Sequence, residues 1–343
     1  MPPNRPRTIK DVAAWAQVST ATVSRVINHA GNVRPHTADR VANALEALGY
    51  VPNAWARAMA TDGSDLVGLI VPDILNPFFA AIYSGLNETA KSRGLAVWMV
   101  DSGDNSEQER QMLHMLGGYR ARGIAITPAH PEANLRAIER IGVPICLVDR
   151  RLAKNLWDMV LIDNVTGSRQ VAQIFVAAGH QRIAIIAGPQ NSTPGLERLS
   201  GFRDALEKEG LSMPPEYIKI GDFRLNSGYA LGQELLALDR PPTAIFSCNN
   251  LMTMGLLQAI HAHPAHSLGK TVAVVGFDDI PISTLTDPPL TVVSRPMREM
   301  GVQAARLIMA RMESPAKPLE TVVLGPQLII RGSEKNPGLL RWI

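Results

Sequence analysis

The stretch that decides the fold of the N-terminal region reads Thr8-Ile9-Lys10-Asp11-Val12-Ala13, followed by Val18-Ser19-Thr20-Ala21-Thr22-Val23-Ser24-Arg25-Val26-Ile27-Asn28. Apolar residues recur in it at helical spacing in two short runs, and a residue that favours a helix start precedes each run. The stretch therefore predicts two short helices joined by a tight turn. Proteins use this arrangement to place a second helix in the major groove of DNA.

These two helices need a third to bury a core. Thr8 and Ser19 are the expected N-caps, and Asp11 stands where an acid completes a capping box. A third apolar stripe ends before Gly49, a residue that favours the end of a helix. The residues expected to share the core are Ile9, Val12, Ala13, Ala16, Val23, Val26, Ile27, Val41, Ala44, Leu45 and Leu48. An ordinary small helical bundle has the same spacing, so the pattern alone leaves DNA binding open.

The distribution of charge favours a polyanionic partner for this region. Residues 1–60 carry seven basic and three acidic residues, a net charge of +4, whereas residues 61–343 carry 27 basic and 28 acidic residues, a net charge of −1. The net positive charge is therefore confined to the first sixth of the chain. Such asymmetry fits nucleic-acid binding by one segment better than a uniformly basic surface would.

The rest of the composition is that of a soluble globular protein with two or three folding units. The 343 residues are 46% hydrophobic and 19% charged. Cys146 and Cys248 lie in apolar, strand-like runs, which favours buried free thiols over a disulfide. The N-terminus lacks the apolar segment of a secretory signal, and no apolar run reaches 18 residues. We therefore expect a cytoplasmic protein without a membrane span.

From Leu66 onward, short apolar runs alternate with helix-like segments. This alternation predicts parallel sheets in doubly wound arrangements, and there is enough chain for two sheets. The runs expected to form strands are Leu66–Val71, Ala96–Val100, Gly123–Thr127, Ile145–Val148, Val160–Ile162, Ile183–Ala187, Tyr217–Ile220, Ala244–Ser247, Val272–Gly276 and Val292–Val293.

Motifs along nearly the whole chain resemble those of the lactose-repressor (LacI/GalR) family. Near the N-terminus they are the stretch 8–28 and then Leu48-Gly49-Tyr50-Val51-Pro52-Asn53. Farther on they include Val67-Gly68-Leu69-Ile70-Val71-Pro72-Asp73, Asn76-Pro77-Phe78-Phe79, Val148-Asp149-Arg150, Gly179-His180, Ala187-Gly188-Pro189, Val274-Val275-Gly276-Phe277-Asp278-Asp279 and Pro288-Pro289-Leu290-Thr291. The number of motifs and their order argue against a chance match.

The resemblance implies an all-α helix-turn-helix head and an α/β core of two doubly wound parallel-sheet lobes, similar to periplasmic sugar-binding proteins. We expect the head at 1–51, a hinge helix and linker at 52–64, and the core at 65–343. Within the core, lobe 1 is expected at about 65–162 and 292–325, and lobe 2 at about 163–291 and 326–343.

The resemblance also implies how DNA is bound. Thr20, Ala21 and Arg25 match the base-reading positions of the recognition helix, although Arg25 could also bind phosphate. Residues expected to contact phosphates are Thr8, Ser19, Thr22, Ser24 and Asn28. Arg34 stands where the family usually caps the third helix with Ser or Thr, so that a cap is expected to be missing and Arg34 to contact phosphate instead.

The segment 52–64 resembles a hinge helix that pairs with its dimer mate in the minor groove. Asn53 can cap it, Arg57 is the candidate for the minor-groove wall, and Met59 would wedge a base step where the family usually has leucine. A helix this short is unstable alone in water. A plain interdomain linker is the alternative interpretation.

The cleft between the lobes is the expected effector site, because ligands of open α/β folds bind beyond the carboxyl ends of strands. Polar and aromatic residues at these ends suit a polar, ring-shaped ligand, and a monosaccharide or derivative is expected. The candidates are Asp73, Asn76, Phe78, Phe79, Asp149, Arg150, Arg198, Phe223, Asn249 and Asp278. Phe79 could equally pack beneath a helix. Asn249-Asn250 stands where the family usually has Asn-Asp, which puts that sugar contact in doubt.

The sequence shows no nucleophile–base constellation and no phosphate-binding glycine loop, so we expect no enzyme, no cofactor and no catalytic residue. The histidines at 261, 263 and 266 match no strong zinc pattern, and His180 is expected to be structural. The expected function is a homodimeric, sequence-specific transcriptional regulator, most simply a repressor, which binds pseudo-palindromic double-stranded operator DNA. The alternatives are a sugar-binding transport receptor and an enzyme acting on sugars.

Overall fold

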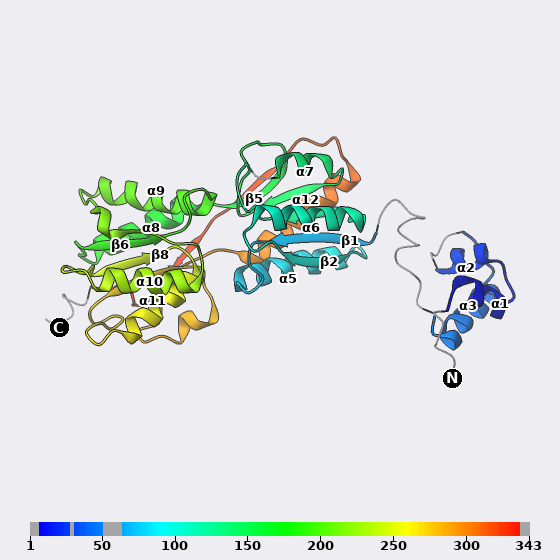
Figure 1. The fold of residues 1–343 in the computed structure, drawn as a ribbon, viewed down its shortest axis with the longest axis horizontal. Coiled ribbons are helices and arrows are strands. Elements are labelled where there is room, and N and C mark those ends of the chain that lie inside the picture. The colour runs from blue at the N-terminus through cyan, green and yellow to red at the C-terminus, as the bar shows by residue number, and fades with distance from the viewer. Residues whose placement is uncertain (1–6, 28–30, 51–63, 133, 337–343) are drawn as a thin grey trace. The chain divides into compact units, whose positions relative to one another are not determined.

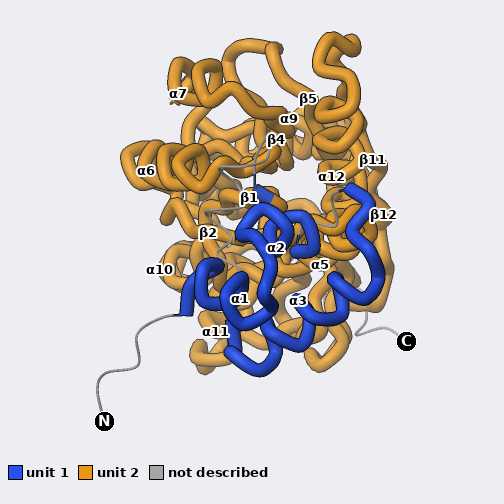
Figure 2. The backbone as a smooth tube through the Cα atoms, turned by 90° about the vertical axis from the view of Figure 1, so that its right-hand side faces the viewer, with its two compact units in different colours: residues 1–64 blue, residues 65–343 orange. Residues whose placement is uncertain are grey.

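The computed structural model describes residues 7–27, 31–50, 64–132 and 134–336 (Figure 1). The chain divides into two units, Met1–Ser64 and Asp65–Ile343, which are coloured separately in Figure 2. Each unit has a hydrophobic core of its own.

Three helices form the described part of the first unit: α1 (Ile9–Trp15), α2 (Thr20–Ile27) and α3 (Pro35–Leu48). A capping box begins α1: Asp11 Oδ2 accepts from the backbone N–H of Thr8 at 2.7 Å, and Thr8 Oγ1 accepts from that of Asp11 at 3.4 Å. The buried core consists of Val12, Ala13, Ala16, Val23, Val41 and Ala44. The three helices and the shared core predicted from the apolar spacing are therefore confirmed.

The helix α3 has distinct residues at its two ends and is anchored to the other helices by one arginine. Arg34 is its N-cap and makes no side-chain capping hydrogen bond, as expected, and Pro35 occupies the first helical position. Gly49 ends the helix in the left-handed region, with φ 57°. The Arg40 guanidinium donates to the backbone oxygens of Ala16 and Gln17, the latter at 3.1 Å. Arg40 thus fastens α3 to the turn between α1 and α2.

Lobe 1 of the second unit is built on a parallel six-stranded sheet with the order β11-β5-β4-β3-β1-β2. Its strands are β1 (Leu66–Val71), β2 (Ala96–Asp101), β3 (Gly123–Ile126), β4 (Ile145–Val148), β5 (Asp158–Ile162) and β11 (Thr321–Leu324). Its helices are α5 (Pro77–Lys91), α6 (Ser106–Gly118), α7 (Leu135–Arg140) and α12 (Met297–Glu313). One core lies beneath α5 and α12, and the other beneath α6 and α7, so helices cover both faces.

Lobe 2 has a sheet of the same size with the order β12-β10-β9-β8-β6-β7, parallel except for the antiparallel edge strand β12. Its strands are β6 (Ile183–Ala187), β7 (Ile218–Ile220), β8 (Ala244–Ser247), β9 (Ala273–Phe277), β10 (Thr291–Ser294) and β12 (Gln327–Ile329). Helices α8 (Asn164–Ala177) and α9 (Thr193–Lys208) lie on one side, and α10 (Leu225–Leu236) and α11 (Asn250–Ala262) on the other (Figure 1).

The chain crosses between the lobes three times, and one crossing differs from the sequence-based boundary. The first follows β5 at Asp163, and the third lies between β11 and β12. The second was expected at residue 292, but β10 pairs with β9 and belongs to lobe 2. The crossing is therefore at Arg295 and Pro296, and lobe 1 resumes with α12. The apolar pattern of Val292 and Val293 predicts a strand but does not indicate which of the two sheets that strand joins.

Lobe 1 depends on close contact between α5 and α12, which lie more than 200 residues apart in the chain. A Cβ atom at Gly85 would lie 2.0 Å from the backbone oxygen of Arg298, and one at Gly301 would lie 2.0 Å from that of Ile82. Glycine is required at both positions because the backbones approach too closely for any side chain.

Both cysteines are free and buried, as expected, and burial raises the pKa of Cys248 to about 12. His180 is buried, and its ring nitrogens contact Thr243 Oγ1 at 3.0 Å and the backbone oxygen of Glu334 at 3.1 Å. These contacts support the structural role expected for it.

Within the described ranges, no helix is both long and apolar enough to cross a membrane.

Candidate functional site: an exposed helix face and a closed interlobe cleft

The face of α2 opposite its core presents the predicted base-reading residues to solvent. Thr20, Ala21 and Arg25 are exposed, whereas Val23 is fully buried beneath them. Thr22 and Ser24 are half-buried beside this face. An exposed helix with one arginine, a hydroxyl and a methyl group offers what base edges and phosphates accept.

Two of the residues predicted to contact phosphates also cap helices. Ser19 Oγ accepts from the backbone N–H of Thr22 at 3.1 Å and so caps α2. Thr8 Oγ1 donates to Asp11 Oδ2 at 2.9 Å in the capping box of α1. Arg34 is exposed. The predictions for Asn28, Asn53, Arg57 and Met59 lie outside the described residues.

One cavity between the lobes brings together nine of the ten predicted effector residues. Those lining it are Asp73, Asn76, Phe78, Phe79, Asp149, Arg150, Arg198, Phe223 and Asn249. The tenth, Asp278, lies behind the lining and contacts it through Arg295. The cavity is also lined by four charged residues that were not predicted from the sequence: Asp104, Asp222, Arg224 and Arg295. Asp104 and Arg295 closely follow β2 and β10, so the rule of strand ends could have found both.

Three sets of polar contacts hold the lobes together around the cavity. Arg224 Nη1 of lobe 2 lies 2.8 Å from Asp73 Oδ2 of lobe 1. Asn250 Nδ2 of lobe 2 donates to Asn76 Oδ1 of lobe 1 at 2.8 Å. The backbone N–H of Arg151 donates to Thr193 Oγ1 at 2.9 Å. The structure is therefore that of a closed cleft.

The closed cleft is small. Its volume is about 40 Å³, enough for a few water molecules and less than a sugar ring occupies. A ring-shaped ligand would therefore enter only after the lobes have separated.

Arg295, at the second crossing, joins acids from both lobes. Its Nη1 donates to Asp149 Oδ1 at 2.5 Å, and its Nε and Nη2 donate to the two oxygens of Asp278 at 2.5 and 3.0 Å. Its guanidinium carbon lies 3.6 Å from the centroid of the Phe78 ring. Burial by itself would lower the pKa of Arg295. The nearby carboxylates, Asp278 foremost, have the larger combined effect and raise that pKa. Asp149 and Asp278 both have left-handed backbones, with φ 67° and 79°.

Arg198 is fully buried and has one donor without a protein partner. Its Nε donates to Asn164 Oδ1 at 2.8 Å, and its Nη1 donates to the backbone oxygen of Cys248 at 2.6 Å. Its Nη2 is buried and meets no acceptor among the described residues. Burial, and then the charge of Arg295, lowers the pKa of Arg198 to about 10, so it stays cationic at neutral pH. A ligand oxygen at Nη2 would complete its hydrogen bonds.

Aromatic residues form the other part of the lining. Phe78 and Phe79 meet edge to face with ring centroids 4.8 Å apart, and both are almost fully buried. The structure therefore leaves Phe79 available for packing and for ligand contact alike. The guanidinium carbon of Arg150 lies 5.9 Å from the centroid of the Phe223 ring, and Arg150 Nη1 donates to Asp104 Oδ1 at 2.5 Å. Within the described ranges, no group of three His, Cys, Asp or Glu side chains could hold a metal ion.

Comparison with known proteins extends over both units. Residues 8–53 match the model of bacterial regulatory proteins of the lacI family, and residues 172–334 match that of the periplasmic binding protein-like domain. The chain is 36% identical to the HTH-type transcriptional regulator CelR of Thermobifida fusca, over 95% of this chain and 98% of the relative. It is 32% identical to the HTH-type transcriptional repressor CytR of Escherichia coli K12, over 96% of each.

Solved structures agree with these relatives. A complex of the transcriptional regulator CelR with cellobiose matches with a TM-score of 0.73 and 33% identity, over 95% of this chain and 99% of that one. A Lac repressor dimer bound to operator and the anti-inducer ONPF matches with a TM-score of 0.81 and 26% identity, over 96% and 100%. The relatives named here are transcriptional regulators matched over nearly their whole length, head included, which disfavours the alternatives of a transport receptor and an enzyme. The chain belongs to the LacI family of bacterial DNA-binding transcriptional regulators.

Proposed function

We propose that this regulator is a homodimeric repressor whose affinity for a pseudo-palindromic operator is set by a small carbohydrate bound between the lobes. The observation that carries the proposal is the gathering of nine predicted effector residues around one interlobe cavity. Since DNA is the partner, we propose that the protein works in the cytoplasm.

The chemistry of the lining supports a neutral, hydroxyl-rich ring as the effector. Most of its acids are already neutralised by arginines: Asp73 by Arg224, Asp104 by Arg150, and Asp149 by Arg295. The remaining contacts are hydrogen-bond donors and acceptors beside aromatic faces, a combination that suits sugar hydroxyls and C–H groups. The relative CelR was solved with cellobiose.

The proposed DNA contacts lie on α2 and at its edge. Thr20, Ala21 and Arg25 would read base edges, whereas Ser19, Thr22, Ser24, Thr8 and Arg34 would position the head on phosphates. We extend the proposal to Asn28 as a phosphate contact and to the hinge residues Asn53, Arg57 and Met59, in keeping with the family resemblance.

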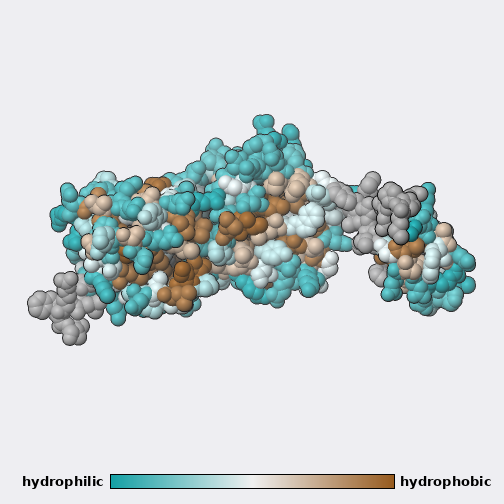
Figure 3. Space-filling model, turned by 60° about the horizontal axis from the view of Figure 1, so that its bottom comes forward, coloured by the Kyte–Doolittle hydropathy of each residue, from teal (hydrophilic) through white to brown (hydrophobic). Residues whose placement is uncertain are grey.

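The proposed dimer surface follows the free edges of the two sheets. On lobe 1, Trp98 of the edge strand β2 is 45% exposed, and Ile74, which lines the same surface pocket, is 43% exposed. The next residue in the chain, Leu75, is 83% exposed. On lobe 2, Ile220 of the edge strand β7 and Leu285 are exposed. Figure 3 shows hydrophobic residues gathered on one face of the unit 65–343. Paired copies would bury these side chains, and the Lac repressor named above was solved as a dimer on its operator.

The proposed mechanism is a coupling between lobe closure and the order of the hinge. A ligand that binds one state of closure more tightly shifts the population toward that state. Paired hinge helices would form in only one of the two states, so effector and operator affinities become linked. Whether the effector releases the operator or promotes its binding is the outcome that the experiment below measures.

The test uses the full chain and an operator selected in vitro from a random duplex library. A thermal-shift screen against pentoses, hexoses, disaccharides, sugar acids and nucleosides should reveal stabilisation by a sugar. The sugar that stabilises the protein most should then change its affinity for the operator, as measured by gel-shift titration. Failure of every polar ring compound to stabilise the protein would contradict the effector site, and failure to select any duplex would contradict the DNA-binding role.

A further inference from the structure

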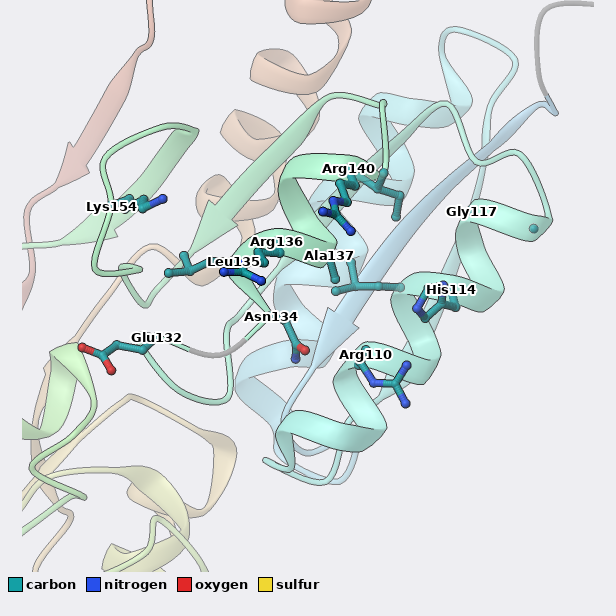
Figure 4. Close-up of a pocket in the computed structure, with 13 residues that line it drawn as sticks. Arg110, His114, Gly117, Glu132, Asn134, Leu135, Arg136, Ala137, Arg140 and Lys154 are labelled. Atoms are coloured by element: carbon teal, nitrogen blue, oxygen red, sulfur yellow. The ribbon is translucent and has the colours of Figure 1, made fainter.

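A second cavity lies on lobe 1, between α6 and α7, and shares no residue with the interlobe cavity (Figure 4). Its volume is about 810 Å³, as large as a typical ligand pocket. Leu113, Leu135, Ala137 and Ile141 give it an apolar floor. The charged residues around it are Arg110, Arg136, Arg140, Lys154 and Glu132, four of them basic. We call this cavity the α6–α7 groove.

Part of the positive charge beside the α6–α7 groove has no counter-charge within the described chain. Arg110 pairs with Glu107 at 2.5 Å, and Lys154 pairs with Glu139 at 3.2 Å. Arg136 and Arg140 are exposed, stand one turn apart on α7, and form no ion pair or hydrogen bond with the described residues. Like charges four positions apart on a helix repel each other and destabilise it. An anion at these two arginines would remove that repulsion.

Hydrogen bonds fix the position of α7 relative to α6 at one end of the α6–α7 groove. Asn134, which precedes α7 with a left-handed φ of 56°, donates from Nδ2 to the backbone oxygen of Ser106 at 2.7 Å and to Glu109 Oε1 at 2.9 Å. Glu109 is fully buried, and its Oε2 accepts from the backbone N–H of Ala129 at 2.7 Å. These bonds tie the start of α7 to the start of α6. A partner would therefore meet a preformed surface, which lowers the entropic cost of binding.

We propose that the α6–α7 groove is the docking site for an acidic, amphipathic peptide segment of a partner protein. Apolar side chains of the segment would lie on the floor, and its carboxylates would meet Arg136 and Arg140 at the rim. A nucleic acid would use the rim alone, because phosphates leave an apolar floor unfilled. The groove shares no residue with the dimer surface proposed above, so a dimer could hold the segment on both copies.

The test measures binding of a designed fluorescent peptide to the full chain. The probe is a 14-residue helical peptide with leucines spaced three and four residues apart and glutamates elsewhere, carrying a photo-crosslinking residue. We expect adducts on residues of α6 or α7. We also expect R136S/R140S to weaken binding by about tenfold, since the variant removes two exposed charge contacts at the rim. The matched control R169S/R240S removes two exposed arginines from lobe 2 and should change binding less than about twofold.

Three outcomes would overturn the proposal. Equal binding by the two double variants would show that the groove arginines are not used, and adducts on the basic head would place the peptide elsewhere. A peptide with serines in place of the leucines that binds as tightly would reduce the site to a plain anion patch. Thermal unfolding and operator binding of R136S/R140S should match the wild type, which separates this test from that of the proposed function.

Discussion

Asn250 donates its side-chain amide to Asn76 Oδ1 across the closed cleft at 2.8 Å. Both residues are almost fully buried, and Asn76 Oδ1 also accepts from the backbone N–H of Phe78 at 3.0 Å. An ionised aspartate at position 250 has no donor to offer. The amide at position 250, where the family usually has an acid, therefore helps to hold the lobes together.

We expect Asn250→Asp to destabilise the closed state, because it sets a carboxylate against an amide oxygen without a bridging hydrogen. The expected loss is about 1–3 kcal/mol in the free energy of unfolding, measured by denaturant titration. Asn105→Asp is the matched control: Asn105 Oδ1 only accepts, from Glu107 N and Gln108 N, so aspartate preserves that cap. Equal losses for both variants would contradict the role assigned to Asn250.

Arg198→Lys should weaken effector binding. The single ammonium group of lysine cannot replace both protein contacts of Arg198 and also donate a hydrogen bond to the ligand in place of Nη2. The loss of a hydrogen bond to a charged group is about 1.5–3 kcal/mol, or roughly 10- to 150-fold in the dissociation constant. Calorimetric titration with the sugar found by thermal shift measures it. Arg203→Lys changes an exposed arginine on the same helix and should leave the affinity unaltered. A wild-type affinity in Arg198→Lys would remove this residue from the site.

Arg25→Ala should reduce discrimination between the selected operator and unrelated duplex by about 1–3 kcal/mol while leaving sugar binding intact. The reason is that Arg25 is exposed on α2 and buries nothing in the head core. Competitive gel-shift titration at fixed salt gives the ratio. Lys10→Ala, at an exposed position of α1, should alter affinity for all sequences alike. Unchanged discrimination in Arg25→Ala would show that Arg25 does not read bases.

Gly301→Ala should destabilise the core by about 1–3 kcal/mol, because its Cβ atom would lie 2.0 Å from Ile82 O and 2.7 Å from Leu86 N. Gly118→Ala, at the end of α6, meets nothing within 4 Å and should raise stability by up to about 1 kcal/mol. Denaturant titration of each variant measures the free energy of unfolding and so tests both expectations. If both substitutions were neutral, the contact between α5 and α12 would be looser than described.

Burial lowers the pKa of His180, so the native state resists its protonation more than the unfolded state does. The stability contributed by neutral His180 is therefore present above the unfolded pKa of about 6.5 and is lost as the pH falls through the lowered native pKa. His180→Gln should flatten the decline of stability as the pH falls below about 6.5, relative to the wild type. His261→Gln, at an exposed position, should leave that slope in place.

Most of the strands that the sequence predicted are fully buried, although the predicted edge strands β2 and β7 are partly exposed. Leu66–Val71, Ile145–Val148, Ile183–Ala187 and Ala244–Ser247 have uninterrupted apolar runs because helices cover both faces of their sheets, and their bounds agree with the structure. The edge strands β11 and β12 were missed because they are short and partly exposed, so their residues lack that run. Hydrophobicity therefore found the buried strands, and at the sheet edges it found β2 and β7 but not β11 and β12.

The effector residues were predictable to the extent that they follow strands. Asn76 follows the buried strand β1 within five residues and Asp149 comes directly after β4, and the structure brings both to one cavity. Arg295 directly follows β10 and so lies at a strand end, but its pairing with acids of both lobes arises from a crossing between the lobes that local pattern does not reveal. Its partners Asp149 and Asp278 are 146 and 17 residues away in the chain. Pairings of that range depend on tertiary structure and have no local signal.

The route of the chain through lobe 1 sets an order for its synthesis on the ribosome. The sheet of lobe 1 lacks β11 until residue 324 has been made, and one of its cores lacks α12 until residue 313. By then lobe 2 is complete except for its edge strand β12 and the residues after it. Domains otherwise fold from the N-terminus onward during translation. Lobe 1 begins first and finishes late, so its half-built apolar face, including Gly85, must wait until lobe 2 has been translated as far as β10.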